Sequence, residues 1–268
     1  MLLAKEYLGE VGVGATSPLF FRANDDCIYV VKVMMNPLGG KILASESVAA
    51  SFGRLLDLPF PASDYFCITE EWLREHPYLA DSRITAGLHF ASRYLENVQY
   101  VTPEYLPLIR NRPSIAGMIL FDHLFHNADR AQNRKNMLLI SSGREAYTLY
   151  GIDHSHLFRS GRWTIHSLSD WEYRIRLYDQ NMYGMFITDW IYANDFMPYI
   201  HVIQQIEDHT IKEVLRAVPR EWLPDARERE ALFHFVRTRF ELVNEIHRKI
   251  CHHIPLARGG YYDPYANL

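Results

Sequence analysis

The sequence predicts an α+β fold of two lobes, a small β-rich N-terminal lobe with one helix and a larger, mostly helical C-terminal lobe. Three observations predict it. Short runs rich in β-branched and aromatic residues, separated by Gly, Asn and Asp, characterise the first part of the chain. Helical periodicity dominates from Trp171 onward, and a proline-containing stretch over 101–113 separates the two patterns. We place the lobes at 1–100 and 101–268.

The N-terminal lobe begins with strands joined by turns. Residues 11–17 contain two glycines, Thr16 and Ser17, a composition typical of a turn between two strands. Residues 24–26 (Asn-Asp-Asp) predict a hairpin turn, which leads into a strand over 27–34 and then a loop over 36–40.

One helix belongs to this lobe. Residues 42–56 have apolar side chains at helical spacing, so we expect an amphipathic helix. Pro59 and Pro61 terminate it, because proline cannot continue a helix, and a strand over 65–69 follows. The apolar residues on or near one face are Leu43, Val48, Phe52, Leu55 and Leu56.

The C-terminal lobe starts with a strongly apolar helix over 114–126. A polar Asp-Arg loop separates it from a pair of short apolar strands. The remaining predicted elements are strands over 137–140 and 147–152 and helices over 200–218 and 228–253. The tail over 256–268 shows no clear period.

Composition limits the class of protein. The 268 residues are 48% hydrophobic, enough for a large buried core, and 28 basic against 32 acidic side chains give a net charge of −4. No block of like charge predicts nucleic-acid or membrane-surface binding. Cys27, Cys67 and Cys251 are widely spaced, without a C-x-x-C pair. No secretion signal and no bilayer-length apolar run are apparent, so we expect a cytoplasmic protein.

The most informative stretch is 121–140, FDHLFHNADRAQNRKNMLLI. It places Asp129 on a polar loop before an apolar strand, with Asn133 and Asn136 between them. Asp153 ends the next apolar run. Two carboxylates and an amide at adjacent strand ends are what a magnesium-dependent phosphotransferase needs to orient a hydroxyl and hold metal on nucleotide phosphates. An ion pair between Asp129 and Arg130 would explain the first motif alone, but not the recurrence of Asp153.

A lysine and a glutamate upstream support that interpretation. Lys32 lies within a strand, on the face opposite Val31 and Val33. Glu46 follows in the predicted helix, and a strand lysine paired with a helix glutamate presents an ammonium group to phosphate. Taken singly, Lys32 is compatible with an exposed strand lysine and Glu46 with a solvated helix residue.

The glycine-rich turn before this strand is a candidate phosphate loop. Gly12 and Gly14 would let backbone amides approach an anion, and the hydroxyls of Thr16 and Ser17 could add hydrogen bonds. The turn matches neither G-x-x-x-x-G-K-[ST] nor G-x-G-x-x-G, and a plain hairpin turn explains it equally well.

Four histidines crowd the same region, namely His123, His126, His154 and His156. They lack any zinc-binding spacing, and magnesium prefers oxygen ligands, so we interpret them as polar lining or structural hydrogen-bonding groups. No G-x-S-x-G motif is present, which argues against a hydrolase of that type.

Together these segments resemble the HipA-like kinases, and most closely the compact bacterial branch without the extra N-terminal subdomain. The resemblance lies in ATSPLFF, DDCIYVVKV, ESVAASFGRLLDLPFP, FDHLFHNADR, NMLL, YGIDHS and VPREWL, in that order. It implies a protein-kinase-like fold with two lobes. It also implies ATP- and Mg²⁺-dependent phosphorylation of a hydroxyl, most often on Ser or Thr of a protein.

The resemblance also implies roles for individual residues. Lys32 would contact the nucleotide phosphates, Glu46 would orient Lys32, and Asp129 would be the catalytic carboxylate. Asp153 would bind magnesium. The metal-binding amide is Asn136, which directly precedes the apolar strand, or Asn133, because the loop is longer than in common kinases. Gly14, Thr16 and Ser17 fall in the phosphate loop, which is itself phosphorylated in some family members.

Two rival functions remain. The acceptor pocket cannot be deduced from the sequence, so a small-molecule or lipid kinase on the same fold is one alternative. A non-catalytic nucleotide-binding pseudokinase or scaffold is the other, because the Asp-to-Asn spacing differs from that of common kinases. The oligomeric state is not predicted.

Overall fold

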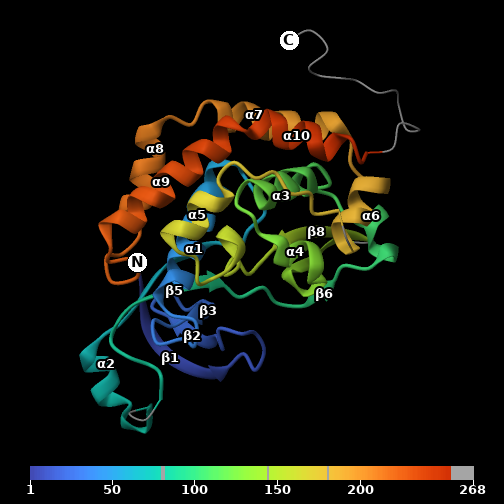
Figure 1. Cartoon of the computed structure of the whole chain (residues 1–268). Coiled ribbons are helices and arrows are strands. Elements are labelled where there is room, and N and C mark those ends of the chain that lie inside the picture. The colour runs from blue at the N-terminus through green and yellow to red at the C-terminus, as the bar shows by residue number, and fades with distance from the viewer. Residues whose placement is uncertain (80–81, 144, 180, 255–268) are drawn as a thin grey trace.

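The computed structural model describes residues 1–79, 82–143, 145–179 and 181–254 (Figure 1). Helices and strands both contribute extensively, so the predicted α+β class is confirmed. Five strands form a closed barrel, three form a second sheet, and the C-terminal half is mainly helical. The division into two lobes at residue 100 stays a prediction.

The barrel has the strand order β1-β2-β3-β5-β4 and closes through parallel pairing of β1 with β4. Closure removes the unpaired strand edges that an open sheet would expose. Alternate side chains point inward, among them Phe21, Val31 and Phe66, which are fully buried. The strands are β1 (Leu2–Glu10), β2 (Leu19–Ala23), β3 (Ile28–Lys32), β4 (Ser63–Ile68) and β5 (Gly87–Arg93). The short helix α2 (Glu70–Glu75) follows β4.

Helix α1 (Gly40–Leu55) lies between the barrel and the C-terminal helices and contacts both β5 and α8 (Figure 1). The predicted helix is confirmed, but its amphipathic character is not, because it is covered on most sides. Most of its residues are buried, including Glu46 at 3% exposure, whereas Leu55, expected on the apolar face, is 42% exposed. The sequence pattern failed because α1 is covered by two separate parts of the fold.

The second sheet brings two polar segments together. Its antiparallel order is β6 (Val98–Tyr100), β7 (Met137–Gly143) and β8 (Ala146–Gly151), so the two predicted strands are confirmed and β6 is added. Met137 pairs with Gly151, which places the residues just before β7 beside those just after β8.

The helical half differs from the prediction in where its long helices break. The predicted helix over 200–218 is two helices, because Glu207 has extended backbone geometry, and the one over 228–253 is interrupted at Leu242. The predicted tail lies outside the described residues. The helices are α3 (Pro113–Leu124), α4 (Ala128–Gln132), α5 (Ile165–Trp171), α6 (Asn181–Asp189), α7 (Met197–Gln204), α8 (Asp208–Ala217), α9 (Ala226–Glu241) and α10 (Val243–Cys251).

Short 3₁₀ helices lie in the connections between these elements. They are η1 (Pro77–Leu79), η2 (Pro103–Leu108), η3 (Arg134–Asn136), η4 (Leu157–Arg159) and η5 (Ala193–Phe196). Among the described residues, no helix combines the length and apolar character needed to cross a bilayer.

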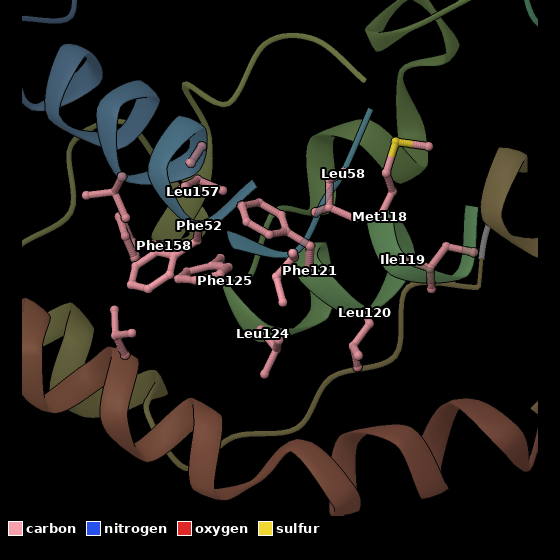
Figure 2. Close-up of a cluster of buried hydrophobic side chains, with 14 of the residues drawn as sticks. Phe52, Leu58, Met118, Ile119, Leu120, Phe121, Leu124, Phe125, Leu157 and Phe158 are labelled. Atoms are coloured by element: carbon pink, nitrogen blue, oxygen red, sulfur yellow. The ribbon is translucent and has the colours of Figure 1, made fainter. Parts of the chain in front are cut away.

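The main hydrophobic core joins α1 to α3 (Figure 2). The ring of Phe125 lies 5.4 Å from that of Phe52 and 4.6 Å from that of Phe121, measured between centroids. Phe158 packs on Phe125 from the other side at 6.2 Å. Burying each such ring contributes roughly 1.5–3 kcal/mol, so this core holds α1 and the segment after Asp153 against the end of α3.

Candidate active site

Three predicted site residues meet where the barrel, α1 and the second sheet converge. Lys32 ends β3, Glu46 lies in the second turn of α1, and Asp153 follows β8. The Lys32 ammonium donates to Glu46 Oε1 and, at 2.7 Å, to Asp153 Oδ1. Both contacts bridge parts of the chain far apart in sequence.

The charges in this cluster stabilise one another. Burial disfavours charged Lys32, but the carboxylates of Asp153 and Glu46 outweigh burial and raise its pKa. Burial also disfavours the two ionised carboxylates, yet Lys32 lowers the pKa of each, with His154 and Ser155 as additional partners. All three groups are therefore ionised at neutral pH.

His154 is a site residue that the sequence did not single out for this role. Its backbone N–H donates to Glu46 Oε1 at 3.0 Å, and its ring Nδ1 lies 3.2 Å from Glu46 Oε2. Asp153 has a left-handed backbone with φ 58°, which directs the chain sharply after β8. His154, the residue after Asp153, thus fixes the position of the Glu46 carboxylate that contacts Lys32. Its adjacency to Asp153 was the only available sequence signal.

Asp129 lies beside this cluster, in α4 rather than on the predicted polar loop. The correction has a local cause. Left-handed geometry at His126 ends the preceding helix, and no proline or glycine prevents a new helical turn over 128–132. Asp129 Oδ2 accepts a hydrogen bond of 2.5 Å from Asn136 Nδ2 and lies 3.8 Å from His156 Nδ1.

Of the two candidate amides, Asn136 is closer to the aspartates. Its backbone oxygen accepts from Ile152 N–H at 2.9 Å, next to Asp153, while its side chain bonds to Asp129. Asn133 contacts Asn136 at 3.3 Å and caps η3 by accepting from Lys135 N–H. Asn133 is therefore connected to Asp129 through Asn136 rather than directly.

The donor chemistry fits magnesium. Every hydrogen bond to Asp153 among the described residues ends on Oδ1, which leaves Oδ2 available for another ligand. Carboxylate and amide oxygens suit Mg²⁺, which commonly uses one or two protein ligands together with nucleotide phosphates and water. In the described part of the chain no three His, Cys, Asp or Glu side chains form a metal cage.

Arg130 connects the site to the buried part of α3. Its partner is Asp122 of α3 rather than the neighbouring Asp129, with Nη1 at 2.8 and 2.9 Å from the two carboxylate oxygens. Both side chains are fully buried. Asn127 and Tyr183 also donate to Asp122, and Arg130 Nη2 reaches the carbonyl of Ile152 at 3.4 Å. The network joins α4 to the start of the Asp153 segment.

The glycine-rich turn is less closely connected to the cluster. It forms the β1–β2 connection, where Ser17 N–H bonds to Gly14 O at 3.0 Å and Ser17 has φ 46°. Thr16 is buried, and Gly14 and Gly12 are exposed with positive φ. Among the described residues, no hydrogen bond links the turn to Lys32, so its role stays a prediction.

A pocket opens on the α1 side of the cluster. Glu46, Asp153 and His154 contribute polar groups to it, and Phe60 and Phe90 contribute apolar walls. The His154 Nε2 atom is buried without a hydrogen-bond partner, so this wall has an unused polar group.

Comparison with known proteins identifies the family. The model of the HipA-like kinases matches residues 5–250. The chain belongs to the HipA-like kinase family. Among solved structures, the Helicobacter pylori proinflammatory kinase CtkA is similar in fold, with a TM-score of 0.57 and 14% sequence identity over 96% of this chain and 98% of that chain. The search of curated proteins found no match. The resemblance inferred from the sequence is thus confirmed, and a kinase fold accounts for the arrangement of the site.

Proposed function

We propose that this chain is an ATP- and Mg²⁺-dependent kinase that transfers the γ-phosphate to a hydroxyl, most often a serine or threonine of a protein. One observation carries the proposal. A buried lysine contacts a helix glutamate and a strand-end aspartate at once, beside a second aspartate bonded to an amide. These are the components that phosphoryl transfer requires.

The proposed division of labour follows from the contacts. Lys32, kept ionised by its two carboxylates, binds nucleotide phosphates as a point charge, and Glu46 fixes its position. Asp153 and Asn136, with Asn133 as the alternative amide, hold Mg²⁺. When bound, the metal neutralises charge on the phosphate oxygens.

Asp129 is proposed to orient the acceptor hydroxyl and to take its proton. Its side chain is 28% exposed, so a substrate can reach it, and Asn136 fixes one of its oxygens. Positioned general bases contribute about 10²–10⁴-fold to rate. The turn with Gly14, Thr16 and Ser17 would cover the phosphates, so residues 1–100 would form the nucleotide-binding lobe.

The test is phosphate transfer from radiolabelled ATP in the presence of Mg²⁺, to the chain itself and to a panel of protein, lipid and small-molecule acceptors. Asp129→Asn should reduce transfer by about 10²–10⁴-fold, because a carboxamide cannot take the proton. Asp153→Ala should abolish transfer, because it removes the carboxylate proposed to hold Mg²⁺. The matched control is Asp208→Asn, a change of a half-exposed carboxylate on α8 that should leave transfer unchanged.

Each outcome decides between the functions considered. Full activity in a double variant lacking both Asp129 and Asp153 would disprove the proposed site. Labelled lipid or small molecule without labelled protein would establish the small-molecule alternative. Nucleotide binding by thermal shift without any transfer would establish a pseudokinase.

A further inference from the structure

Four exposed arginines lie between residues 159 and 176, in the stretch that follows the candidate metal aspartate. They are Arg159, Arg162, Arg174 and Arg176, here called the arginine surface. In the part of the chain that the structure describes, none of the four forms a salt bridge. The chain as a whole carries a net charge of −4, so this concentration of unpaired positive charge is local.

One indole ring holds two of these guanidinium groups together. The guanidinium of Arg159 lies 3.6 Å from the Trp171 ring centroid and that of Arg174 lies 5.2 Å away. Such cation–π contacts stabilise an exposed guanidinium without neutralising it. Arg176 is close as well. Burial raises the pKa of Tyr178 to about 12, while the positive charges of Arg176 and Arg159 act against that rise.

The arginine surface adjoins the proposed catalytic carboxylate. Phe158 N–H bonds to Phe125 O at 2.7 Å and Arg159 N–H bonds to His126 O at 3.1 Å, so this segment runs beside the residues just before Asp129. His156, three residues before Arg159, lies 3.8 Å from Asp129 Oδ2. A substrate hydroxyl at Asp129 therefore brings its flanking residues to the arginines.

Positive charge also lies on the other flank of Asp129. Arg134 and Lys135 are exposed, precede Asn136 directly, and form no salt bridge among the described residues. The nearest acidic groups in sequence are Glu172, Asp179, which contacts His253 at 3.7 Å, and Asp170, which contacts His166 at 3.5 Å. Within the described residues, none of the three forms a salt bridge with the arginine surface.

We propose that the arginine surface binds aspartate and glutamate side chains that flank the phosphoacceptor hydroxyl of a protein substrate. The inference rests on the proposed function and adds a substrate class to it. Guanidinium groups bind carboxylates through two parallel hydrogen bonds, and an extended peptide advances about 3.3 Å per residue. Acidic residues within a few positions of the hydroxyl are thus within reach of the surface.

A peptide explains the surface better than a nucleic acid does. The Trp171 ring, which could otherwise stack on a base, is already covered by guanidinium groups. The net charge of −4 also repels a long polyanion, whereas a short acidic segment meets only the local field.

Binding can be measured without catalysis. Fluorescein-labelled peptides would carry one serine flanked by Asp and Glu, by Asn and Gln, or by Lys, with a single-stranded oligonucleotide of matched charge as a fourth probe. Fluorescence anisotropy should show the acidic peptide binding about tenfold more tightly than the amide peptide, because two exposed charge pairs together contribute of the order of a factor of ten. Added NaCl should weaken that preference.

Substitutions of the arginines test whether the preference for acidic peptides comes from the arginine surface. Arg159→Gln with Arg174→Gln should reduce the preference for the acidic peptide, because only Arg162 and Arg176 of the arginine surface remain, and Arg159→Glu should reduce it as well. The matched control Arg216→Gln, an exposed arginine on α8, should keep the acidic preference. Matching thermal unfolding midpoints would show that the variants remain folded.

Equal binding of acidic and amide peptides to the unmodified chain would overturn the inference. So would tighter binding of the oligonucleotide, or an acidic preference that is undiminished in the double glutamine variant. Failure of the proposed function is a different result, because it would appear as absence of phosphate transfer from ATP while the anisotropy comparison stays interpretable.

Discussion

Acidification from pH 8 to pH 5 should destabilise the chain through two buried histidines. His123 Nδ1 donates to Ile119 O at 2.7 Å, and its Nε2 accepts from Tyr178 N–H at 3.0 Å. His126 Nδ1 accepts from the Tyr178 hydroxyl at 2.9 Å, and its Nε2 donates to Trp171 O at 3.2 Å. Each ring is therefore a neutral tautomer with both nitrogens used. Protonation would set a donor of His123 against the Tyr178 backbone N–H, and would require the Tyr178 hydroxyl to change from donor to acceptor at His126.

The expected loss follows from the pKa values. Burial lowers the pKa of His123 to about 4 and that of His126 to about 3, against 6.5 in the unfolded chain. The stabilisation is fully present above pH 6.5 and declines as the pH falls, because only the unfolded chain takes up the protons. Linkage gives about 2 kcal/mol per histidine between pH 8 and pH 5, or about 4 kcal/mol for both. That is a large share of a typical stability of about 5–15 kcal/mol.

The assay is urea unfolding at the two pH values. His123→Asn and His126→Asn should each destabilise the chain at pH 8, but each should shrink the difference between pH 8 and pH 5 by about 2 kcal/mol. His166→Asn is the matched control, because that side chain is 88% exposed in the folded chain. Variants that retain the full wild-type difference would refute the assignment to these two rings.

Three further changes test the core of the site and the packing beneath it by chemical denaturation. Lys32→Met leaves the buried Glu46 carboxylate without its ammonium partner, so we expect a loss of about 3–5 kcal/mol together with loss of phosphate transfer. Asp122→Asn removes the charge that compensates fully buried Arg130, with a similar loss expected; an unchanged unfolding midpoint would contradict the pairing. Gly117→Ala places a methyl group 2.5 Å from a tyrosine ring of α7, which should cost about 1–3 kcal/mol without altering nucleotide binding.

Several elements were predictable because their pattern is local. The hairpin turn before β3, the alternation that places Val31 and Val33 in the barrel, and the apolar run of α3 all follow from neighbouring residues. Strands β5 and β6 and helices α5 and α6 were not delineated. The strands β5 and β6 complete sheets whose other members lie elsewhere in the chain, so their own sequence carries little signal.

The candidate site likewise contains residues that the sequence predicted and contacts that it did not predict. The sequence predicted Lys32 within a strand, Glu46 in the helix that follows it, Asp129 after an apolar helix and Asp153 at the end of an apolar strand. The partnership of Arg130 with Asp122 was not predictable, since the sequence offered a nearer carboxylate at Asp129.

What the sequence determined by itself is the α+β class, the order of the chemical groups and membership of the HipA-like family. Tertiary structure alone decided that Glu46 is buried, that His154 holds it, and that arginines from two separate segments meet on Trp171. The physical reason is that residue type and spacing specify local geometry. Burial and charge pairing instead depend on which distant segments the closed barrel and the shared aromatic core bring together.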